Sequence, residues 1–429
     1  YAQEIAPVPG SSILDTKIAR EVAIETALYK RDASMETAFQ NLEKNSLQAP
    51  SNPQTTTLPE TIPSLWEKLR FNETFLGLHG YVETRSYFNL HKNNDKFYYY
   101  QLRNNLRLKK ELNFTPQLNA LASLDGQLYY FLNSDDGFQN KDSWIKPWEL
   151  YLDYFKDKLD IRVGQQLIRW GKSDEVNPTD VFTPEDLSEF FNNVERAKRK
   201  IPIPAVKSNY YFGEDSEYAV ETIWLPFFKR TRFDFAGGNW EPYLSRYYRS
   251  LGLKFLNDKG PDHNLGHSSF ATKFKKQGED YDVSLSYSYH YSETPALEVD
   301  ALNGTVSYIY PRQHTIGSDF ETVLGKFGIR GEGAYTTKTP FVSYSPDVPK
   351  LVVYRDALNY IVGVDYTFSN NLYTNIQYAQ QFIPLYPKDL ATQRLEDSVV
   401  WRITKDFLRE TLTFKTTGRY YLSTQDFVG

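Results

Sequence analysis

The chain contains 429 residues, and its 54 acidic and 49 basic side chains leave a formal charge of −5. This near balance gives no reason to expect a nucleic-acid partner. The absence of cysteine excludes disulfides, thiol catalysis and cysteine-ligated metals. Aromatic residues make up 16% of the sequence, and 33 residues are tyrosine. Because tyrosine and tryptophan gather at membrane interfaces, and no apolar run reaches the ~18 residues of a spanning helix, the composition favours a transmembrane β-barrel.

The first 70 residues differ from the rest. Tyr1-Ala2-Gln3 is similar to the end of a secretory signal, since small residues precede signal cleavage sites, and we expect a processed, exported chain. Residues 1–48 are predicted to be an amphipathic helical segment in the periplasm, because apolar residues recur there at helical spacing. Residues 49–70 are rich in proline and are predicted to form an extended linker.

The predicted N-terminal helix has an apolar stripe that must be buried on another surface. The candidate contact residues are Ile18, Val22, Leu28 and Phe39. The stripe packs on the barrel of its own chain, or it binds a partner, for example a periplasmic or inner-membrane export protein docked through residues 11–48. The sequence leaves both interpretations open.

From residue 71 to residue 429 the sequence predicts the barrel. Between Phe97 and Leu112 apolar and charged residues alternate, so a strand here has one apolar and one charged face. Short turns and long links also alternate along the chain, which is typical of outer-membrane barrels. Fifteen strands are predicted near residues 74–87, 97–113, 117–132, 145–156, 159–170, 204–213, 217–229, 262–276, 280–292, 312–324, 327–337, 355–368, 371–382, 396–407 and 410–423.

Single-chain bacterial barrels have an even number of strands. We therefore expect an all-β fold, a transmembrane antiparallel β-barrel of about 16 strands with 14 as the alternative, preceded by the helical N-terminal segment. Either a closing strand is missing beyond Gly429, or two of the predicted segments are one. The least certain region is 230–261, where Tyr247 to Leu253 could itself be a strand.

The longest link, residues 171–204, has the most specific local sequence. Asn177 to Asp180 is predicted to form a turn, and Thr183-Pro184 to start a helix, with a hydroxyl N-cap and proline at the first helical position. The link is therefore structured, either as a packed extracellular loop or as a loop folded into the lumen that narrows the pore. The candidate constriction residues are Asn177, Asp180, Thr183, Asp186, Arg196 and Lys198.

Several short motifs in this part of the chain resemble a known family. They are Gly164-Gln165-Gln166, Trp170-Gly171-Lys172, Asn177-Pro178-Thr179-Asp180, Thr183-Pro184-Glu185-Asp186 and Ile203-Pro204-Ala205-Val206-Lys207 followed by Tyr210-Tyr211. Together they resemble an uncharacterised family of Gram-negative outer-membrane porin-like β-barrels, most strongly over residues 145–230. The resemblance implies an accessory role in envelope export or uptake, sometimes alongside resistance-nodulation-division type pumps. It implies no catalytic residues, and it does not cover the segment 11–48.

Strand parity gives a set of residues that face away from the apolar side of their strands, and thus into the lumen. The candidate lumen and selectivity residues are Arg103, Arg107, Lys109, Glu111, Arg162, Asp319, Glu321, Arg330, Glu332, Arg402 and Lys415. Opposed basic and acidic ladders would set a transverse field that orients dipolar solutes. The alternative is that these charges solvate the wall and pair with one another.

No motif in the sequence indicates chemistry on a substrate. His263 and His267 are four residues apart, but the surrounding residues predict loop and strand rather than the helix that such a ligand pair needs, so no metal is expected. There is no G-x-S-x-G elbow for a serine hydrolase. No cofactor is expected.

The sequence thus predicts a non-enzymatic channel in the bacterial outer membrane that passes small solutes or amphiphiles. Its partner is the lipid bilayer, and a homo-oligomer is one option. The first alternative is the barrel component of a multi-protein envelope transport assembly that docks its partner through the N-terminal helix. The second alternative is a barrel hydrolase that acts on lipid.

Overall fold

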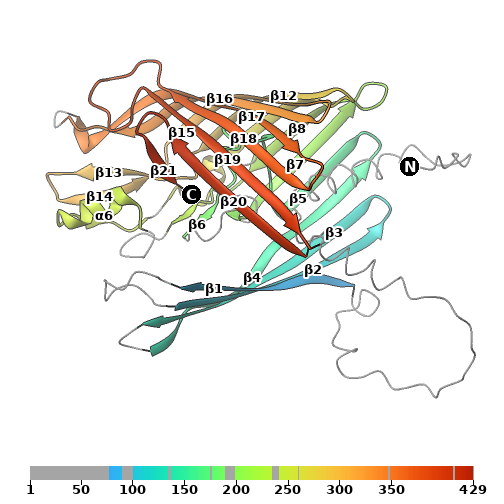
Figure 1. Cartoon of the computed structure of the whole chain (residues 1–429), viewed down its shortest axis with the longest axis horizontal. Coiled ribbons are helices and arrows are strands. Elements are labelled where there is room, and N and C mark those ends of the chain that lie inside the picture. Colours follow the sequence, from blue (N-terminus) through green and yellow to red (C-terminus); the bar gives the residue numbers. More distant parts are fainter. Residues whose placement is uncertain are drawn as a thin grey trace, which may run out of the picture. The chain divides into compact units, whose positions relative to one another are not determined.

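The protein is described by a computed structural model that covers residues 77–88, 100–133, 137–173, 176–188, 199–233, 241–258, 260–345, 348–408 and 411–428. Within these ranges sixteen strands form one sheet, in which each strand pairs with the next long strand along the chain (Figure 1). The order begins at β1 and ends at β21. This up-and-down antiparallel arrangement is that of a β-barrel wall, as the sequence predicts.

Most strands of this sheet are long. In pairing order they are β1 (Leu78–Phe88), β2 (Tyr100–Thr115), β3 (Leu118–Asn133), β4 (Gly137–Lys156), β5 (Leu159–Gln166), β7 (Ile203–Phe212), β8 (Tyr218–Leu225), β11 (Ser269–Lys276), β12 (Tyr281–Tyr291), β15 (Arg312–Leu324), β16 (Phe327–Val342), β17 (Val352–Thr367), β18 (Leu372–Phe382), β19 (Leu395–Phe407), β20 (Leu412–Tyr421) and β21 (Asp426–Val428). All fifteen predicted strands are present. The sixteenth is β21, a three-residue strand at the end of the chain, where no further strand was expected.

The remaining elements lie in the long links. A two-stranded sheet joins β6 (Asp186–Leu187) to β9 (Arg232–Phe233), and a three-stranded sheet joins β10 (Lys254–Phe255), β14 (Thr305–Ile309) and β13 (Ala296–Asp300). The helix α6 (Tyr243–Ser250) and the short 3₁₀ turns η1 (Leu265–His267) and η2 (Pro349–Leu351) complete the set. Among the described residues, no helix is both long and apolar enough to cross a bilayer.

The outer face of the sheet is apolar in the middle of its strands. Exposed aliphatic side chains there include Leu106, Leu124, Leu285, Ile316, Val362 and Ile376. Aromatic side chains flank them at both ends. Exposed rings near the short turns are Tyr154, Tyr210, Phe274, Tyr281 and Phe327, and exposed rings near the long links are Trp224, Phe270, Tyr287, Tyr289, Tyr335 and Tyr354. An apolar band between two aromatic belts is the exterior of a transmembrane barrel.

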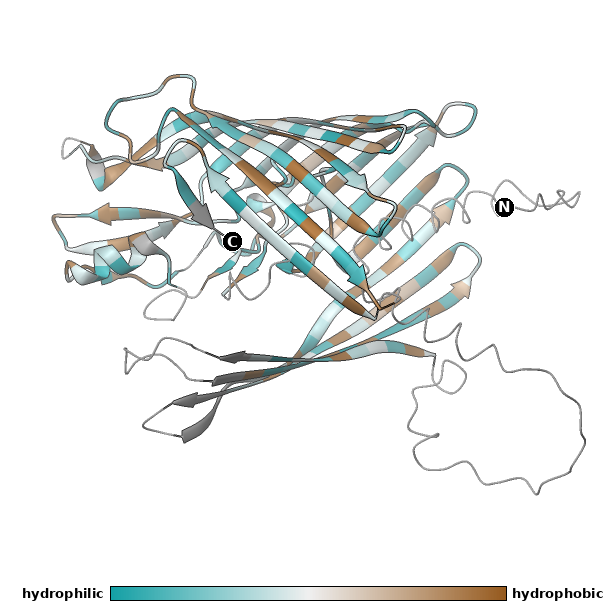
Figure 2. Ribbon diagram, viewed as in Figure 1, coloured by the Kyte–Doolittle hydropathy of each residue, from teal (hydrophilic) through white to brown (hydrophobic). Residues whose placement is uncertain are grey.

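The inner face is polar and largely buried, and we define it as the face on which Ile168, Trp170 and Phe182 pack. Buried polar side chains on it include Asp125, Glu221, Lys273, Asp319, Arg330, Glu332, Asn375 and Gln377. Figure 2 shows hydrophobic and hydrophilic residues in alternation along the strands. Soluble proteins bury apolar residues and expose charged ones, so this distribution is inverted. The inversion agrees with lipid outside and a polar lumen inside.

Two local predictions are wrong. Tyr247, in the stretch that could have been a strand, lies in the helix α6, because Leu244 and Tyr248 are one helical turn apart and pack together against Val299 and Val306. The strand expected at 159–170 ends at Gln166 instead, because Ile168 and Trp170 turn into an apolar cluster on the inner face. Figure 1 shows α6, β13 and β14 grouped at the end of the sheet that carries the long links.

The chain divides into two compact units, residues 1–63 with 405–414, and residues 64–404 with 415–429. The described part of the first unit is the turn between β19 and β20, where Thr413 Oγ1 donates a hydrogen bond to Asp406 Oδ1 (2.6 Å). The predicted boundaries at residues 48 and 70, and the predicted helix with Ile18, Val22, Leu28 and Phe39, lie outside the described residues.

Adjacent residues of β2 provide a test of the two faces. An arginine in place of Leu106, which points outward, should destabilise the barrel by ~2–4 kcal/mol in a refolding titration, because a charge then faces the bilayer midplane. Asn105 lies on the inner face, opposite Glu83. Asn105→Arg should therefore change the free energy of unfolding much less. Equal effects of the two substitutions would contradict the assignment of the faces.

Candidate functional site: an insertion packed on the inner face

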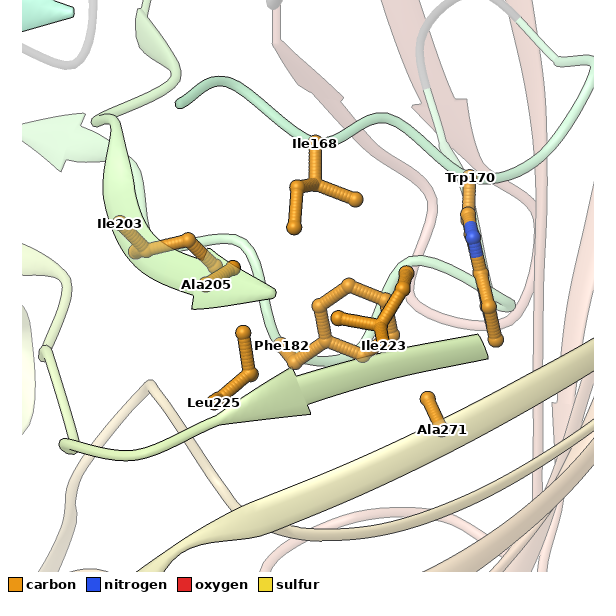
Figure 3. Close-up of a cluster of buried hydrophobic side chains, with 8 residues drawn as sticks. All are labelled: Ile168, Trp170, Phe182, Ile203, Ala205, Ile223, Leu225 and Ala271. Atoms are coloured by element: carbon orange, nitrogen blue, oxygen red, sulfur yellow. The ribbon is translucent and has the colours of Figure 1, made fainter. Parts of the chain in front are cut away.

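The link between β5 and β7 folds back onto the inner face of the sheet. Its side chains Ile168, Trp170 and Phe182 form a buried cluster with residues of β7, β8 and β11 (Figure 3). Figure 3 shows Ile168, Trp170 and Phe182 of the link gathered with Ile203, Ala205, Ile223, Leu225 and Ala271 of the strands. The Trp170 and Phe182 rings meet edge to face, with centroids 4.8 Å apart. Apolar contact therefore holds the insertion on both sides of its turn, through Ile168 and Trp170 before the turn and Phe182 after it. Thr183 Oγ1 joins the two sides by donating a hydrogen bond to Ile168 O (2.8 Å).

Beyond Trp170 the insertion makes polar contacts. We call residues Gly171–Asp180 the tongue. Lys172 Nζ reaches Asp282 Oδ2 on β12 (2.8 Å) and Glu321 Oε2 on β15 (3.3 Å). Burial lowers the pKa of Lys172, but the hydrogen bond and charge of Asp282, together with Glu321, outweigh it and raise this pKa above its usual value. Lys172 is thus a charged bridge from the tongue to two strands of the wall.

Glu332, on β16, is the main wall contact of the tongue. Its carboxylate accepts a hydrogen bond from Thr179 Oγ1 (2.6 Å) and another from the backbone N–H of Ser173 (3.1 Å). Gly171 has φ +89°, and a Cβ there would lie 2.4 Å from Glu332 Oε2. Only glycine therefore allows the tongue to lie this close to the carboxylate.

The wall under the tongue is a network of ion pairs. Arg330 Nη2 lies 2.7 Å from Asp365 Oδ2, and its Nη1 donates to Lys172 O (3.3 Å). Lys273 Nζ pairs with Asp319 Oδ2 (2.8 Å). On β8, Glu221 accepts hydrogen bonds from the Trp170 indole and from Lys275 Nζ. These buried charges are paired with one another, as they must be to tolerate burial.

The outer end of the insertion is held by a second group of charges. The buried Lys200 lies 2.7 Å from Asp180 and 3.1 Å from Glu185, and Arg199 also contacts Glu185 (3.2 Å). Near them, in the link after β12, burial raises the pKa of Glu293 to about 8, against the opposing charge of Lys200. The pairing of β6 with β9 adds a short backbone ladder at the same end.

The predicted turn and helix in this insertion had different outcomes. The turn at Asn177 to Asp180 is confirmed, with the N–H of Asp180 bonded to Asn177 O (3.2 Å). The prediction that a helix starts at Thr183 is wrong. The Thr183 hydroxyl donates its hydrogen bond to Ile168 O instead of capping a helix N-terminus, and Asp186 begins the strand β6. Asp186 contacts Arg232 (2.9 Å). Arg196 and Lys198 lie outside the described residues.

The candidate lumen residues all lie on the inner parity of their strands. Asp319, Glu321, Arg330 and Glu332 come together under the tongue. On the β2 to β5 wall, Arg107 pairs with Asp125 (3.2 Å), Arg162 with Asp153 (2.6 Å) and Lys109 with Glu111 (2.7 Å), and Arg103 lies over the Tyr129 ring. Arg402 and Lys415 lie away from both groups, on β19 and β20.

Sequence reasoning missed the residues that anchor the insertion, namely Lys172, Ile168, Trp170 and Phe182. One signal could have found their site. In β7 and β8 the inner positions Ile203, Ala205, Ile223 and Leu225 are apolar, although the outer positions are apolar as well. A strand that is apolar on both faces is buried on both faces. Among the described residues, no group of three or more His, Cys, Asp or Glu side chains could hold a metal ion.

Comparison with known proteins gives a family. Residues 81–411 match the family described as Protein of unknown function (DUF1302). The chain belongs to this family. The expectation of an uncharacterised family is thereby confirmed. No curated protein matches this DUF1302 chain.

Several solved structures resemble this DUF1302 protein at low identity. OmpF of Salmonella typhi in complex with daunomycin is 10% identical, with 81% of this chain and 93% of that chain covered and a TM-score of 0.45. The outer membrane channel DcaP of Acinetobacter baumannii is 9% identical, with 76% and 80% covered and a TM-score of 0.37. OccAB1 of Acinetobacter baumannii is 11% identical, with 80% and 78% covered and a TM-score of 0.42. The family has no assigned function, so function must be inferred from the site itself.

Lys172 tests how the tongue is held. Lys172→Ala removes charged hydrogen bonds to Asp282 and Glu321, each of which contributes about 1.5–3 kcal/mol, and should increase the population with a detached tongue about tenfold or more. Limited proteolysis of the refolded barrel should then cut between residues 171 and 202 correspondingly faster. The control is Lys158→Ala, in an exposed turn. Equal cleavage rates in the two variants would show that the ion pairs do not hold the tongue.

Proposed function

We propose that this protein is a channel in the bacterial outer membrane, and that its insertion narrows the path for small solutes or amphiphiles. The main support is the combination of an apolar, aromatic-belted exterior with a polar inner face on which a structured insertion packs. A polar lumen is what a water-filled path requires. A link that merely covered the mouth of the barrel would have no need for contacts with strand residues such as Glu321 and Glu332.

The arrangement of charge supports a selective path rather than a plain one. Carboxylates predominate on the β12 to β17 wall under the tongue, including Asp282, Asp319 and Glu332. The opposite group of strands, β2 to β5, presents Arg103, Arg107 and other cations, several stacked on aromatic rings. A solute between the two would meet a transverse field, which orients dipolar molecules. Selectivity would then depend on the lumen charges and on the insertion.

The assembly alternative depends on residues 11–48, which lie outside the described residues. Its test is deletion of residues 1–60 followed by copurification from membranes. Loss of a copurifying envelope protein, with conductance unchanged, would favour the assembly role. The lipid-hydrolase alternative draws no support from the described residues, since four lumen carboxylates form ion pairs with Lys172, Lys273, Lys275 and Arg330. The buried Glu332 is engaged by the hydroxyl of Thr179 and the backbone N–H of Ser173.

The tongue gives the sharpest test of a channel. Its two ends lie close together, because Thr183 contacts Ile168 O and Asn177 Nδ2 contacts Trp170 O (3.4 Å). Replacement of residues 172–180 by three glycines should therefore remove the tongue and leave Trp170 and Phe182 over the apolar cluster. In a planar bilayer we expect the wild type to conduct, and the variant to have a higher single-channel conductance because its pore is wider.

The control for this deletion is a change of equal length away from the lumen, three glycines in place of residues 297–305 in the β13–β14 hairpin, which should leave conductance as in the wild type. Circular dichroism would establish that each variant retains its strands. A wild type that does not conduct would contradict the channel. A variant with unaltered conductance would contradict the narrowing role of the tongue.

A further inference from the structure

β4 contains a bulge in the middle of the β2 to β5 wall. Ala122 pairs with Leu150 and Leu124 with Pro147, so Ser123 stands opposite two residues, Trp148 and Glu149. The extra backbone amide is satisfied, because the N–H of Glu149 donates to Ser123 Oγ (2.9 Å). Bulges redirect side chains and recur next to functional sites. Here the bulge directs Trp148 to the inner face.

Neighbouring side chains hold the bulge in place. Gln165 Nε2 donates to Trp148 O and also to Pro147 O (3.3 Å). Glu149 Oε1 accepts the N–H of Leu167, the first residue of the insertion (3.0 Å). Gly164 has φ +139° and lies against the β4 backbone, where a Cβ would be 2.2 Å from Leu150 O. The Gly-Gln-Gln motif of β5 is thus a support for the bulge, as expected around a preorganised site.

Trp148 is surrounded by cations and aromatic rings. The Arg107 guanidinium lies 4.4 Å from the Trp148 ring centroid, and Lys146 Nζ lies 5.6 Å from the same ring. Lys146 Nζ is also 3.6 Å from the ring of Trp144, and Arg107 is 5.7 Å from the ring of Tyr81. Cations stacked on rings in this way form a surface that is positive and apolar at once.

The indole N–H of Trp148 is the unusual group of this surface. Trp148 is 8% exposed, its Nε1 is buried, and within the described part of the chain this nitrogen has no hydrogen-bond partner. A buried tryptophan N–H ordinarily finds an acceptor, because an unsatisfied donor costs about 1–3 kcal/mol. An acceptor brought by a solute would satisfy it.

The charges near Lys146 also favour an anion. Lys229 lies in the link after β8, and burial, followed by the positive charges of Lys146 and Arg232, lowers its pKa to about 8. Lys229 is therefore subject to the positive charge of both Lys146 and Arg232. The neighbouring acids are already engaged, Asp125 with Arg107 (3.2 Å) and Asp186 with Arg232 (2.9 Å). An anion would relieve the repulsion among the cations.

We propose that Trp148, Arg107 and Lys146 form a lumen site for small organic anions that carry a flat apolar or aromatic body. The inference rests on the proposed channel function, because the site lies on the wall of the solute path. The anionic group would accept hydrogen bonds from the indole N–H, the guanidinium and the ammonium, and the apolar body would stack on the rings of Trp144 and Tyr81. Inorganic anions lack the body, and neutral aromatic solutes lack the charge.

Benzoate is a suitable probe, and its binding to the refolded full chain in detergent can be measured by calorimetry. Acetate has the same charged group without a ring, and benzyl alcohol has the ring without the charge. We expect benzoate to bind at least tenfold more tightly than either. Trp148→Phe keeps an aromatic ring and loses the N–H. It should weaken benzoate binding about tenfold, because a tenfold loss of affinity corresponds to the free energy of about one hydrogen bond to a charged group.

The matched control is Trp401→Phe, because Trp401 lies on β19 against Gly418 of β20, and neither of these strands pairs with β4. It should leave benzoate binding unchanged, and Trp148→Phe should retain the strand signal in circular dichroism. Arg107→Lys, which keeps the charge and loses the planar guanidinium, should weaken benzoate more than acetate. Equal affinity for benzoate and acetate, or no difference between the Trp148 and Trp401 variants, would overturn the site.

The two proposals can fail separately. A protein that conducts ions in a planar bilayer but does not distinguish benzoate from acetate would retain the channel and lose the site. A protein that binds benzoate through Trp148 and does not conduct would retain the site and lose the channel. In a conducting protein, benzoate should also block chloride current at lower concentration than acetate does, and Trp148→Phe should remove that difference.

Discussion

A strand that crosses a bilayer must have its backbone N–H and C=O groups paired with neighbouring strands, because hydrocarbon offers them no other partner. The pairing fixes the pleat, and the pleat sends alternate side chains to opposite faces. Leu106 faces outward and Asn105 inward for this reason alone. Charges that would be too costly towards lipid are thereby gathered on one face, where Glu321, Arg330 and Glu332 become available to hold an insertion.

The insertion uses two kinds of contact for two purposes. Apolar packing of Trp170 and Phe182 gives most of the burial and fixes where the link enters the lumen. Polar contacts at Lys172 and Glu332 then fix where the tongue ends, because charged hydrogen bonds depend strongly on distance and direction. The apolar cluster needs no particular strand partner, whereas the tongue requires these carboxylates at these positions. The position of the tongue is therefore determined by charge.

The sequence predicts the strands well because one rule, period two between lipid and water, governs them all. It fails where a tertiary contact outweighs a local preference. Thr183-Pro184 has the local features of a helix start, but the hydroxyl is used by Ile168 O and the chain continues as β6. Tyr247 stands in a stretch rich in tyrosine, yet α6 forms because Leu244 and Tyr248 find Val299 and Val306. Parity assigns the lumen charges to the face opposite the exposed aliphatic side chains, but it does not say which of these charges meet.

The two walls of the lumen differ in how their charges are used. Under the tongue, carboxylates and lysines are committed to holding structure, so they contribute a fixed field and little binding. On the β2 to β5 wall the regular alternation of side chains is broken at Trp148, and groups from neighbouring segments, Ser123, Gln165 and Leu167, hold that break in place. Departures from a local rule persist when they are compensated, and such places are where function is most often found. In the proposed channel, the rigid wall would orient a solute and the bulged wall would recognise it.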